Sequence, residues 1–256
     1  MSDTLDELLG VARQAAEAAA ERLMAHYRTH LTVQTKPDGT PVTVADEEAE
    51  QVIREIITDA FPNHGFYGEE GGAFGLDRPV VWLVDPLDGT KSFVRRTPFF
   101  STQIAAMAGG RLVVGVSSAP AFGEMAWAHA ESDAMLNGEM IRVSDVGQIN
   151  DASISTGNIG TLARSSGWDA LGEVLSHANR TRGYGDFCHY HMLASGRVDA
   201  VIESDVNILD VAALSVIVER AGGVFTDLGG KPLDLDTSSV LAATPGLHQP
   251  LLERFT

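Results

Sequence analysis

The sequence has a single cysteine, Cys188, among its 256 residues. One cysteine excludes a disulfide framework within the chain, and it excludes a zinc site built on several cysteine ligands. No apolar run approaches the roughly 20 residues that cross a bilayer. The first residues are acidic and lack the basic segment and apolar run of a signal peptide. We therefore expect a cytoplasmic protein with no membrane partner.

Basic residues are scarce as well. The chain has 18 lysines and arginines against 35 aspartates and glutamates, so its net charge is −17. Nucleic acids are poor partners for such a chain, because their binding starts with neutralisation of phosphates by basic side chains. A small phosphorylated substrate would also be repelled, unless carboxylates hold divalent cations that reverse the local field. The charge thus predicts no nucleic-acid partner, and it is compatible with a phosphate substrate only at a metal site.

The first half of the chain, residues 1–140, has the pattern of two helices packed on an antiparallel sheet. Apolar residues recur at helical spacing in two segments, which a turn-rich loop at 35–41 separates. A buried strand then stops at Asp85-Pro86, and Gly109-Gly110 predicts a hairpin between two later strands. The predicted helices cover residues 3–28 and 45–60, and the predicted strands cover 79–84, 101–108, 111–117 and 124–129.

In the second half, residues 141–256, predicted strands alternate with predicted helices, which favours an α/β layer. The boundary between the halves falls near residues 137–150, where Asn137-Gly138 marks a turn. The fold class is therefore α/β, with an α+β first half and an α/β second half. The predicted strands lie near 152–156, 180–183, 199–203, 223–226 and 239–243, and the predicted helices near 168–178, 187–195, 210–221 and 246–254.

The most informative segment runs from Trp82 to Thr90. An apolar strand carries Asp85 to its end, and Pro86 fixes its own φ and donates no N–H, which forces a turn that aims Asp85 and Asp88 at one point. Oxygen ligands of this kind suit Mg²⁺, which takes one or two carboxylates together with water and substrate phosphate. Free N–H groups after Gly89 could cradle that phosphate. The pattern favours a metal and phosphate site over an ordinary polar turn.

Two further acidic segments, taken alone, favour an ordinary structural explanation. Glu69-Glu70 lies in a glycine-rich stretch and is more typical of a solvated loop than of a cation site, although adjacent carboxylates repel each other unless a cation or water separates them. Asp210 stands at the start of an apolar helix, where an N-cap explains it fully, and a metal ligand can also cap its helix.

Taken together and in this order, the three segments resemble the inositol monophosphatase family of metal-dependent, lithium-sensitive phosphatases. The resemblance covers nearly the whole chain, although the family usually has tryptophan where Leu209 precedes Asp210. The matching segments are Gly68-Glu69-Glu70, Asp85-Pro86-Leu87-Asp88-Gly89-Thr90 and Leu209-Asp210-Val211-Ala212-Ala213, and Lys36, Thr43-Val44-Ala45-Asp46 and Ala221-Gly222-Gly223 also fit.

The resemblance implies a layered α-β-α-β-α sandwich with the active site between the two halves, and it implies a homodimer. It also implies two or three Mg²⁺ ions per site and in-line hydrolysis without a covalent phospho-enzyme. By matching position, Gly89 and Thr90 would contact the phosphate, and Asp46, Glu69 and Thr90 would orient the attacking water. The implied metal ligands are Glu69, Asp85, the carbonyl of Leu87, Asp88 and Asp210.

The substrate depends on thinner signals. The runs Gly183-Tyr184-Gly185-Asp186-Phe187 and Thr97-Pro98-Phe99-Phe100-Ser101-Thr102 resemble the histidinol-phosphate phosphatases of this family. Apart from its phosphate, histidinol phosphate carries a primary ammonium and an imidazole, and the carboxylates of Asp186 and Glu203 could pair with this cationic end. A role as a helix N-cap explains Asp186 equally well. We expect histidinol phosphate to be hydrolysed, with inositol monophosphate, a 3′-phosphonucleotide or a non-catalytic metal-binding role as alternatives.

Overall fold

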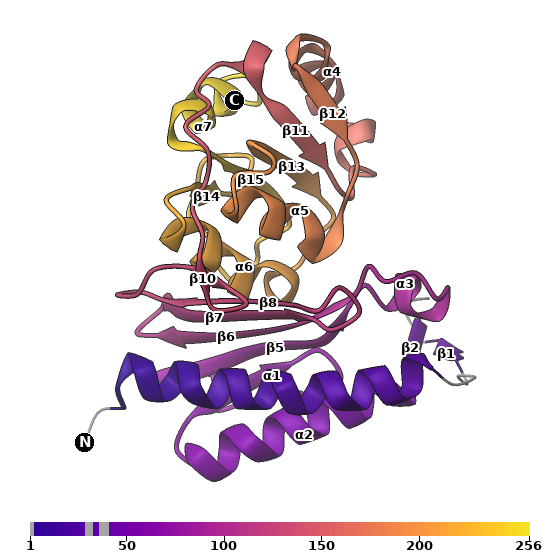
Figure 1. The fold of residues 1–256 in the computed structure, drawn as a ribbon, viewed down its shortest axis with the longest axis vertical. Coiled ribbons are helices and arrows are strands. Elements are labelled where there is room, and N and C mark those ends of the chain that lie inside the picture. The colour runs from indigo at the N-terminus through magenta and orange to yellow at the C-terminus, as the bar shows by residue number, and fades with distance from the viewer. Residues whose placement is uncertain (1–2, 29–32, 36–40) are drawn as a thin grey trace.

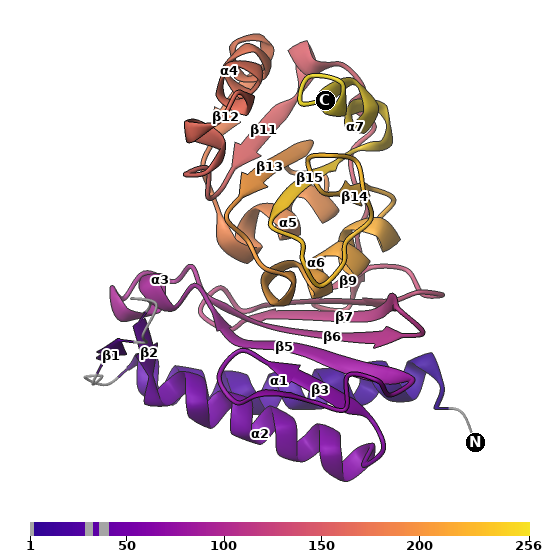
Figure 2. The same ribbon diagram turned by 180° about the vertical axis from the view of Figure 1, so that it is seen from behind.

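The structure is a computed structural model that describes residues 3–28, 33–35 and 41–256. Its elements lie in five layers of alternating helix and sheet (Figures 1 and 2). Helices α1 (Leu5–Tyr27) and α2 (Val44–Ala60) cover one face of an eight-stranded sheet. Helices α5 (Asp186–Ala194) and α6 (Ile208–Arg220) lie between this sheet and a five-stranded one. Helices α4 (Gly167–His177) and α7 (Pro245–Leu252) form the last layer, so the predicted α-β-α-β-α sandwich is confirmed.

The eight-stranded sheet has the strand order β10-β9-β8-β7-β6-β5-β3-β4. Its pairs are antiparallel except for β3 and β5, which run parallel. The antiparallel pairing predicted for β5, β6, β7 and β8 is confirmed, and the parallel pair involves β3, a strand that was not predicted. The strands are β3 (Gly65–Gly68), β4 (Gly72–Phe74), β5 (Val80–Asp88), β6 (Ser101–Ala108), β7 (Arg111–Ala119), β8 (Glu124–His129), β9 (Met135–Leu136) and β10 (Glu139–Met140).

The five-stranded sheet has the order β12-β11-β13-β15-β14 and is mixed. Strand β11 runs parallel to both β12 and β13, whereas β15 runs antiparallel to β13 and β14. The strands are β11 (Ser153–Thr156), β12 (Arg180–Arg182), β13 (Ala200–Ser204), β14 (Val224–Thr226) and β15 (Ser239–Ala243). The remaining elements are β1 (Val33–Thr35), which pairs with β2 (Pro41–Thr43), the short helix α3 (Thr90–Val94), and the 3₁₀ turns η1 (Ile149–Asp151) and η2 (Leu162–Arg164).

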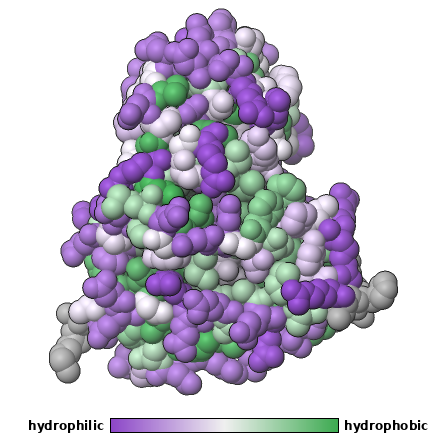
Figure 3. All heavy atoms as spheres, in the orientation of Figure 1, coloured by the Kyte–Doolittle hydropathy of each residue, from purple (hydrophilic) through white to green (hydrophobic). Residues whose placement is uncertain are grey.

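Each sheet face is buried against a helical layer. Side chains alternate along β5, so Trp82 and Val84 pack with α1 and α2, whereas Leu83 packs against Ala212 and Ala213 of α6. The two layers approach closely at Gly115 of β7, where an added Cβ would lie 2.2 Å from the Ala213 carbonyl oxygen. Hydrophilic residues cover much of the upper and lower ends of the face in Figure 3, and hydrophobic ones gather nearer the level of the central helices.

The predicted helices and strands are all present, with small differences at their ends. Strand β5 does not stop at Asp85 as predicted but continues to Asp88 with a shift of register. Strands β1 to β4, β9 and β10 and the short helix α3 were not predicted; β9 and β10 have two residues each, too few to show a period. Most of the turn predicted at 35–41 lies outside the described residues, as does Lys36. No helix among the described residues is long and apolar enough to cross a membrane.

Candidate active site

Strand β5 ends in an irregular turn that presents two carboxylates. The pairing with β6 changes register between Asp85 and Asp88, because Pro86 supplies no N–H to the ladder. The Leu87 N–H donates to Asp85 Oδ1 at 2.9 Å, and the Thr102 hydroxyl donates to the Pro86 carbonyl at 2.9 Å. The turn predicted from the Asp-Pro segment is thus a bulge at the end of a buried strand.

Gly89 turns the chain from β5 into α3. Its φ is +83°, and an added Cβ would lie 2.5 Å from the Phe99 carbonyl oxygen, so only glycine fits without a shift. Thr90 is the first residue of α3, and its hydroxyl lies 3.0 Å from the Leu87 carbonyl oxygen and 3.1 Å from Asp46 Oδ1. The single hydroxyl proton of Thr90 can go to either acceptor.

Asp46 and Asp210 occupy equivalent places on their helices. Each is the third residue of its helix and accepts from the backbone N–H of the capping residue, Thr43 for α2 at 2.8 Å and Asn207 for α6 at 2.9 Å. The N-cap reading of Asp210 is therefore wrong, since Asn207 caps α6 and Asp210 completes a capping box. The position leaves the Asp210 carboxylate at the helix start, where the helix dipole favours negative charge.

The loop that carries Glu69 is held from beneath by the buried carboxylate of Glu50. That carboxylate accepts from the backbone N–H groups of Glu70 at 2.7 Å and Gly71 at 2.8 Å, and it pairs with Arg54 at 2.6 Å. The Glu69 N–H donates to the Val84 carbonyl of β5 at 3.2 Å. These bonds fix the exposed Glu69 beside the end of β5.

Three carboxylates converge in this region. Ligand atoms of Asp85, Asp88 and Asp210 lie within 4.8 Å of one another. Burial raises the pKa of Asp85 well above its usual value, and the charges of Glu69, Asp88 and Asp210 raise it further. Burial, followed by the charges of Asp186 and Asp210, does the same for the pKa of Asp88. Burial raises the pKa of Asp210 to about 7, although the backbone hydrogen bond from Asn207 opposes the shift.

Such a cluster fits a divalent cation. Within the described residues, no ion pair joins a lysine or arginine to Asp85, Asp88 or Asp210. Like charges this close disfavour one another's ionised forms unless a cation lies between them. The donor set consists of oxygens alone, which hard cations such as Mg²⁺ prefer.

Asp186 and Glu203 lie side by side next to these carboxylates. Asp186 is the first residue of α5, has a φ of +48° and makes no capping hydrogen bond, so the N-cap reading is wrong. Burial and the charge of Glu203 raise the pKa of Asp186 to about 6. Glu203 is buried and accepts from the Tyr190 hydroxyl at 2.7 Å, His189 Nε2 at 3.1 Å and the Asn158 N–H at 2.9 Å.

A hollow of about 220 Å³ opens over this arrangement. It is lined by Glu69, Asp85, Leu87, Asp88, Gly89, Thr90, Lys91, Ser92, Asn158, Asp186 and Asp210. Asp46 reaches it through Thr90, and Glu203 lies beneath it in a smaller space of about 20 Å³ beside Asp88 and Asp186. Helices α3, α5 and α6 begin at this hollow and line it from their first turns, and the end of β5 and neighbouring loops supply the other lining residues.

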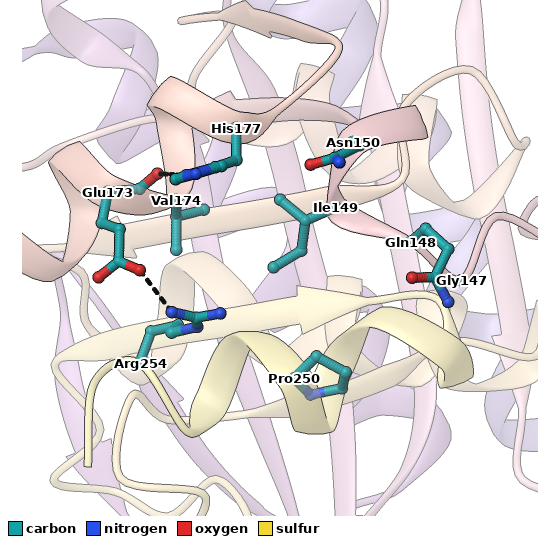
Figure 4. Close-up of a pocket in the computed structure, with 9 residues that line it drawn as sticks. All are labelled: Gly147, Gln148, Ile149, Asn150, Glu173, Val174, His177, Pro250 and Arg254. Carbon is teal, nitrogen blue, oxygen red and sulfur yellow. Dashed lines mark hydrogen bonds and ion pairs between the residues drawn. The ribbon is translucent and has the colours of Figure 1, made fainter.

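A second hollow, of about 310 Å³, lies in the outermost layer between η1, α4 and α7 (Figure 4). The Glu173 carboxylate pairs there with Arg254 at 2.5 Å, and His177 Nδ1 lies 2.9 Å from the Glu173 carbonyl oxygen. The charges of Glu173 and Arg254 therefore compensate each other within this hollow. The five-stranded sheet separates it from α5 and α6, so it takes no part in the carboxylate site.

Sequence reasoning did not find the supports of the site. Glu50 and Arg54 stand four residues apart on a helix, a spacing that signals an ion pair but not its contact with the Glu69 loop. Ser101 donates to Asp88 Oδ2 at 3.0 Å, and its only signal is its place on the neighbouring strand. No sequence signal marks Asn158, whose contact with Glu203 depends on the packing of distant strands.

The layered fold and the acidic hollow are those of a metal-dependent phosphatase. The family model described as "Inositol monophosphatase family" matches residues 4–255. The chain belongs to this family, which is metal-dependent and acts on small phosphorylated substrates, and it is a phosphoric monoester hydrolase.

Individual relatives agree on the family and differ in their substrates. A histidinol-phosphatase of Streptomyces coelicolor is 37% identical over 98% of this chain and 97% of its own. An inositol-1-monophosphatase of Caulobacter vibrioides is 33% identical over 94% of this chain and 98% of its own. The crystal structure of extragenic suppressor protein suhB from Bartonella henselae superimposes with a TM-score of 0.90 at 30% identity, covering 97% of this chain and 98% of its own.

Proposed function

We propose that this protein is a Mg²⁺-dependent phosphatase that hydrolyses histidinol phosphate to histidinol and phosphate. Metal binding is supported by the convergence of Asp85, Asp88 and Asp210, whose ligand atoms lie within 4.8 Å of one another. Glu69 and the Leu87 carbonyl line the same hollow and complete the proposed ligand set for two or three Mg²⁺ ions. When bound, Mg²⁺ supplies an acidified water and spreads the negative charge of the phosphoryl group.

The residues of the chain then position the reactants. Gly89 and Thr90 bind the phosphate oxygens at the start of α3, and Asp88 lines the same hollow. Asp46 accepts the hydroxyl proton of Thr90, so the hydroxyl oxygen is free to accept from the attacking water, which Glu69 also orients. The water attacks phosphorus in line with the ester oxygen, the P–O ester bond breaks, and a proton from the water ends on the leaving alcohol. No covalent bond to the protein forms.

Asp186 is the proposed reader of the substrate. A carboxylate whose pKa is raised to about 6 is mostly ionised at neutral pH and gains most from a cation, because a positive partner relieves the burial of its charge. The cationic end of histidinol phosphate supplies that partner. Glu203 lies directly behind, with its oxygens bound to protein groups, and adds negative charge beneath the binding position rather than a free acceptor.

Activity against a panel of phosphomonoesters tests the proposal. With Mg²⁺ the protein should release phosphate from histidinol phosphate with a higher kcat/KM than from inositol monophosphate or a 3′-phosphonucleotide, and EDTA should stop the reaction. Asp88→Asn should abolish turnover; near wild-type activity of this variant at saturating Mg²⁺ would overturn the site. No turnover of any ester would favour a non-catalytic metal-binding role.

Asp186→Asn separates substrate reading from hydrolysis. Loss of a charge-assisted hydrogen bond, about 1.5–3 kcal/mol, should lower kcat/KM for histidinol phosphate about 10- to 100-fold and leave inositol monophosphate nearly unchanged. Equal losses on both esters, or better turnover of inositol monophosphate by the unaltered enzyme, would favour the inositol phosphatase alternative. That alternative is supported by the Caulobacter vibrioides relative.

Three broader proposals accompany this function. Residues 1–140 and 141–256 act as two halves with the active site between them, a division supported by carboxylates that reach the hollow from both. The enzyme is a homodimer, which sedimentation would test. It works in the cytoplasm, since its single cysteine is buried and the chain has no disulfide to lose there.

A further inference from the structure

A continuous series of hydrogen bonds runs from Asp88 through the protein interior to Glu124 at the start of β8. All its inner members are buried, and it connects strands β6 and β7 with helix α5. From the site outward the series consists of Asp88, Ser101, Gln103, Ser117, His191 and Glu124, and its successive distances are 3.0, 2.7, 3.0, 2.8 and 3.1 Å.

The direction of the hydrogen bonds is set at the far end. Burial lowers the pKa of His191, so this ring is neutral and carries one proton. Glu124 is ionised, since its hydrogen bond with His191 lowers its pKa, and an ionised carboxylate only accepts. The proton therefore lies on Nδ1, which faces Glu124, and Nε2 accepts. Among the described residues, the partner of Nε2 is the Ser117 hydroxyl, which donates to it at 2.8 Å.

Each hydroxyl has one proton to donate, so the donor at the His191 end decides which group donates in every bond nearer to Asp88. Ser117 donates its one hydroxyl proton in the hydrogen bond to His191. Its oxygen must therefore accept from the side-chain amide nitrogen of Gln103, which lies 3.0 Å away. The same nitrogen donates its second proton to Ser101 at 2.7 Å. Ser101 therefore keeps its own proton for Asp88 Oδ2.

The opposite amide orientation of Gln103 would reverse this outcome. Its oxygen would then accept from Ser101, and Asp88 would lose its donor. In the observed orientation that oxygen is buried without a hydrogen-bond partner among the described residues. An unsatisfied buried acceptor is costly, so the orientation is maintained by its neighbours rather than by the amide itself.

We propose that Gln103, Ser117 and His191 are positioning residues of the metal site, because together they commit the proton of Ser101 to one oxygen of Asp88. The inference rests on the proposed function in one respect, namely that Asp88 is a metal ligand. Partners of this kind fix the orientation of a ligating carboxylate, and their loss weakens metal binding about 10- to 100-fold.

Binding of Mn²⁺, followed by electron paramagnetic resonance of the free ion, tests this without turnover. Ser117→Ala should raise the Kd for Mn²⁺ about tenfold, and Ser117→Thr, which keeps the hydroxyl, should restore it. Once Ser101→Ala has removed the last donor, Ser117→Ala should have no further effect. His191→Phe, which removes the acceptor but keeps a ring, provides a second variant with the same expected dependence on Ser101.

The outcomes separate this inference from the function on which it rests. Unchanged Mn²⁺ affinity in Ser117→Ala and His191→Phe, or equal losses with and without Ser101, would overturn it, because independent sites add. Unchanged affinity in Asp88→Asn would instead overturn the metal site itself. Ser118→Ala is the matched control: Ser118 is the next buried residue of β7, and its side chain has no part in the described series.

Discussion

Mg²⁺ should stabilise the folded protein more strongly at about pH 8 than at about pH 5.5. The pKa of Asp210 in the metal-free fold is raised to about 7, above its value in an unfolded chain. Between these two pKa values the folded state binds more protons than the unfolded one, so metal-free stability falls as the pH rises through that range. A ligand carboxylate must release this proton before it can hold a cation.

The size of the effect follows from the same pKa. At about pH 5.5 release of the Asp210 proton costs about 2 kcal/mol, and at about pH 8 it costs almost nothing. For a chain of this length, 2 kcal/mol corresponds to roughly 4–8 °C in Tm. The rise in Tm on adding saturating Mg²⁺ should therefore be larger by that amount at the higher pH. Asp85 and Asp88 shift in the same direction and can only increase it.

Thermal unfolding followed by circular dichroism, with excess Mg²⁺ and with EDTA at each pH, measures these differences. Asp210→Asn should reduce both the stabilisation and its pH dependence. Asp169→Asn, at an exposed position in the first turn of α4, should change neither. An equal rise in Tm at both pH values, or an unchanged response of Asp210→Asn, would refute the reasoning.

Three substitutions outside the proposed ligand set have separate consequences for stability, each measurable by urea unfolding. Glu50→Gln should cost about 2 kcal/mol, because it removes a buried charge that accepts two backbone N–H groups. Asn207→Ala should cost about 1 kcal/mol through loss of the α6 cap. Gly115→Ala should cost about 3 kcal/mol or more, because its Cβ would lie 2.2 Å from the Ala213 carbonyl oxygen.

Each of these three substitutions has a control variant or a result that would contradict its explanation. Glu55→Gln, on the exposed side of the same helix, should be nearly neutral. A stable Asn207→Ser would support the capping explanation, since serine caps equally well. A Gly115→Ala variant as stable as the wild type would mean that β7 and α6 separate at no cost, contrary to the close contact described above.

The fold was largely readable because its periodic segments are long. The α1 pattern and the apolar run of β5 gave the right elements, whereas the two-residue strands β9 and β10 gave no period to read. Asp85 and Asp88 were likewise predictable, since a proline at the end of a strand and a nearby pair of acids constrain the turn between them. The parallel pairing of β3 with β5 was not, because strand order depends on tertiary contacts.

The hydrogen bonds that support the site could not be predicted from the sequence, because they too depend on tertiary contacts. Glu50 and Glu70 are 20 residues apart, and Asn158 and Glu203 are 45 apart. The interpretation of Asp186 and Asp210 as N-caps is wrong for a local reason, because the capping residue of each helix lies upstream of the acid. In both cases a residue one to three positions upstream, Gly185 or Asn207, occupies the cap.

The side chains that line the hollow come from separate elements, and this has a consequence for divergence among enzymes of this kind. No capping hydrogen bond is made at the start of α5, so the Asp186 side chain should be exchangeable with little loss of folding free energy. Asp186 stands on α5, whereas Asp85 and Asp88 stand on β5 and Asp210 on α6. Under the proposed function, selection at Asp186 can alter which alcohol is released while the carboxylate cluster stays as it is, so that proteins with the same architecture can act on different phosphate esters.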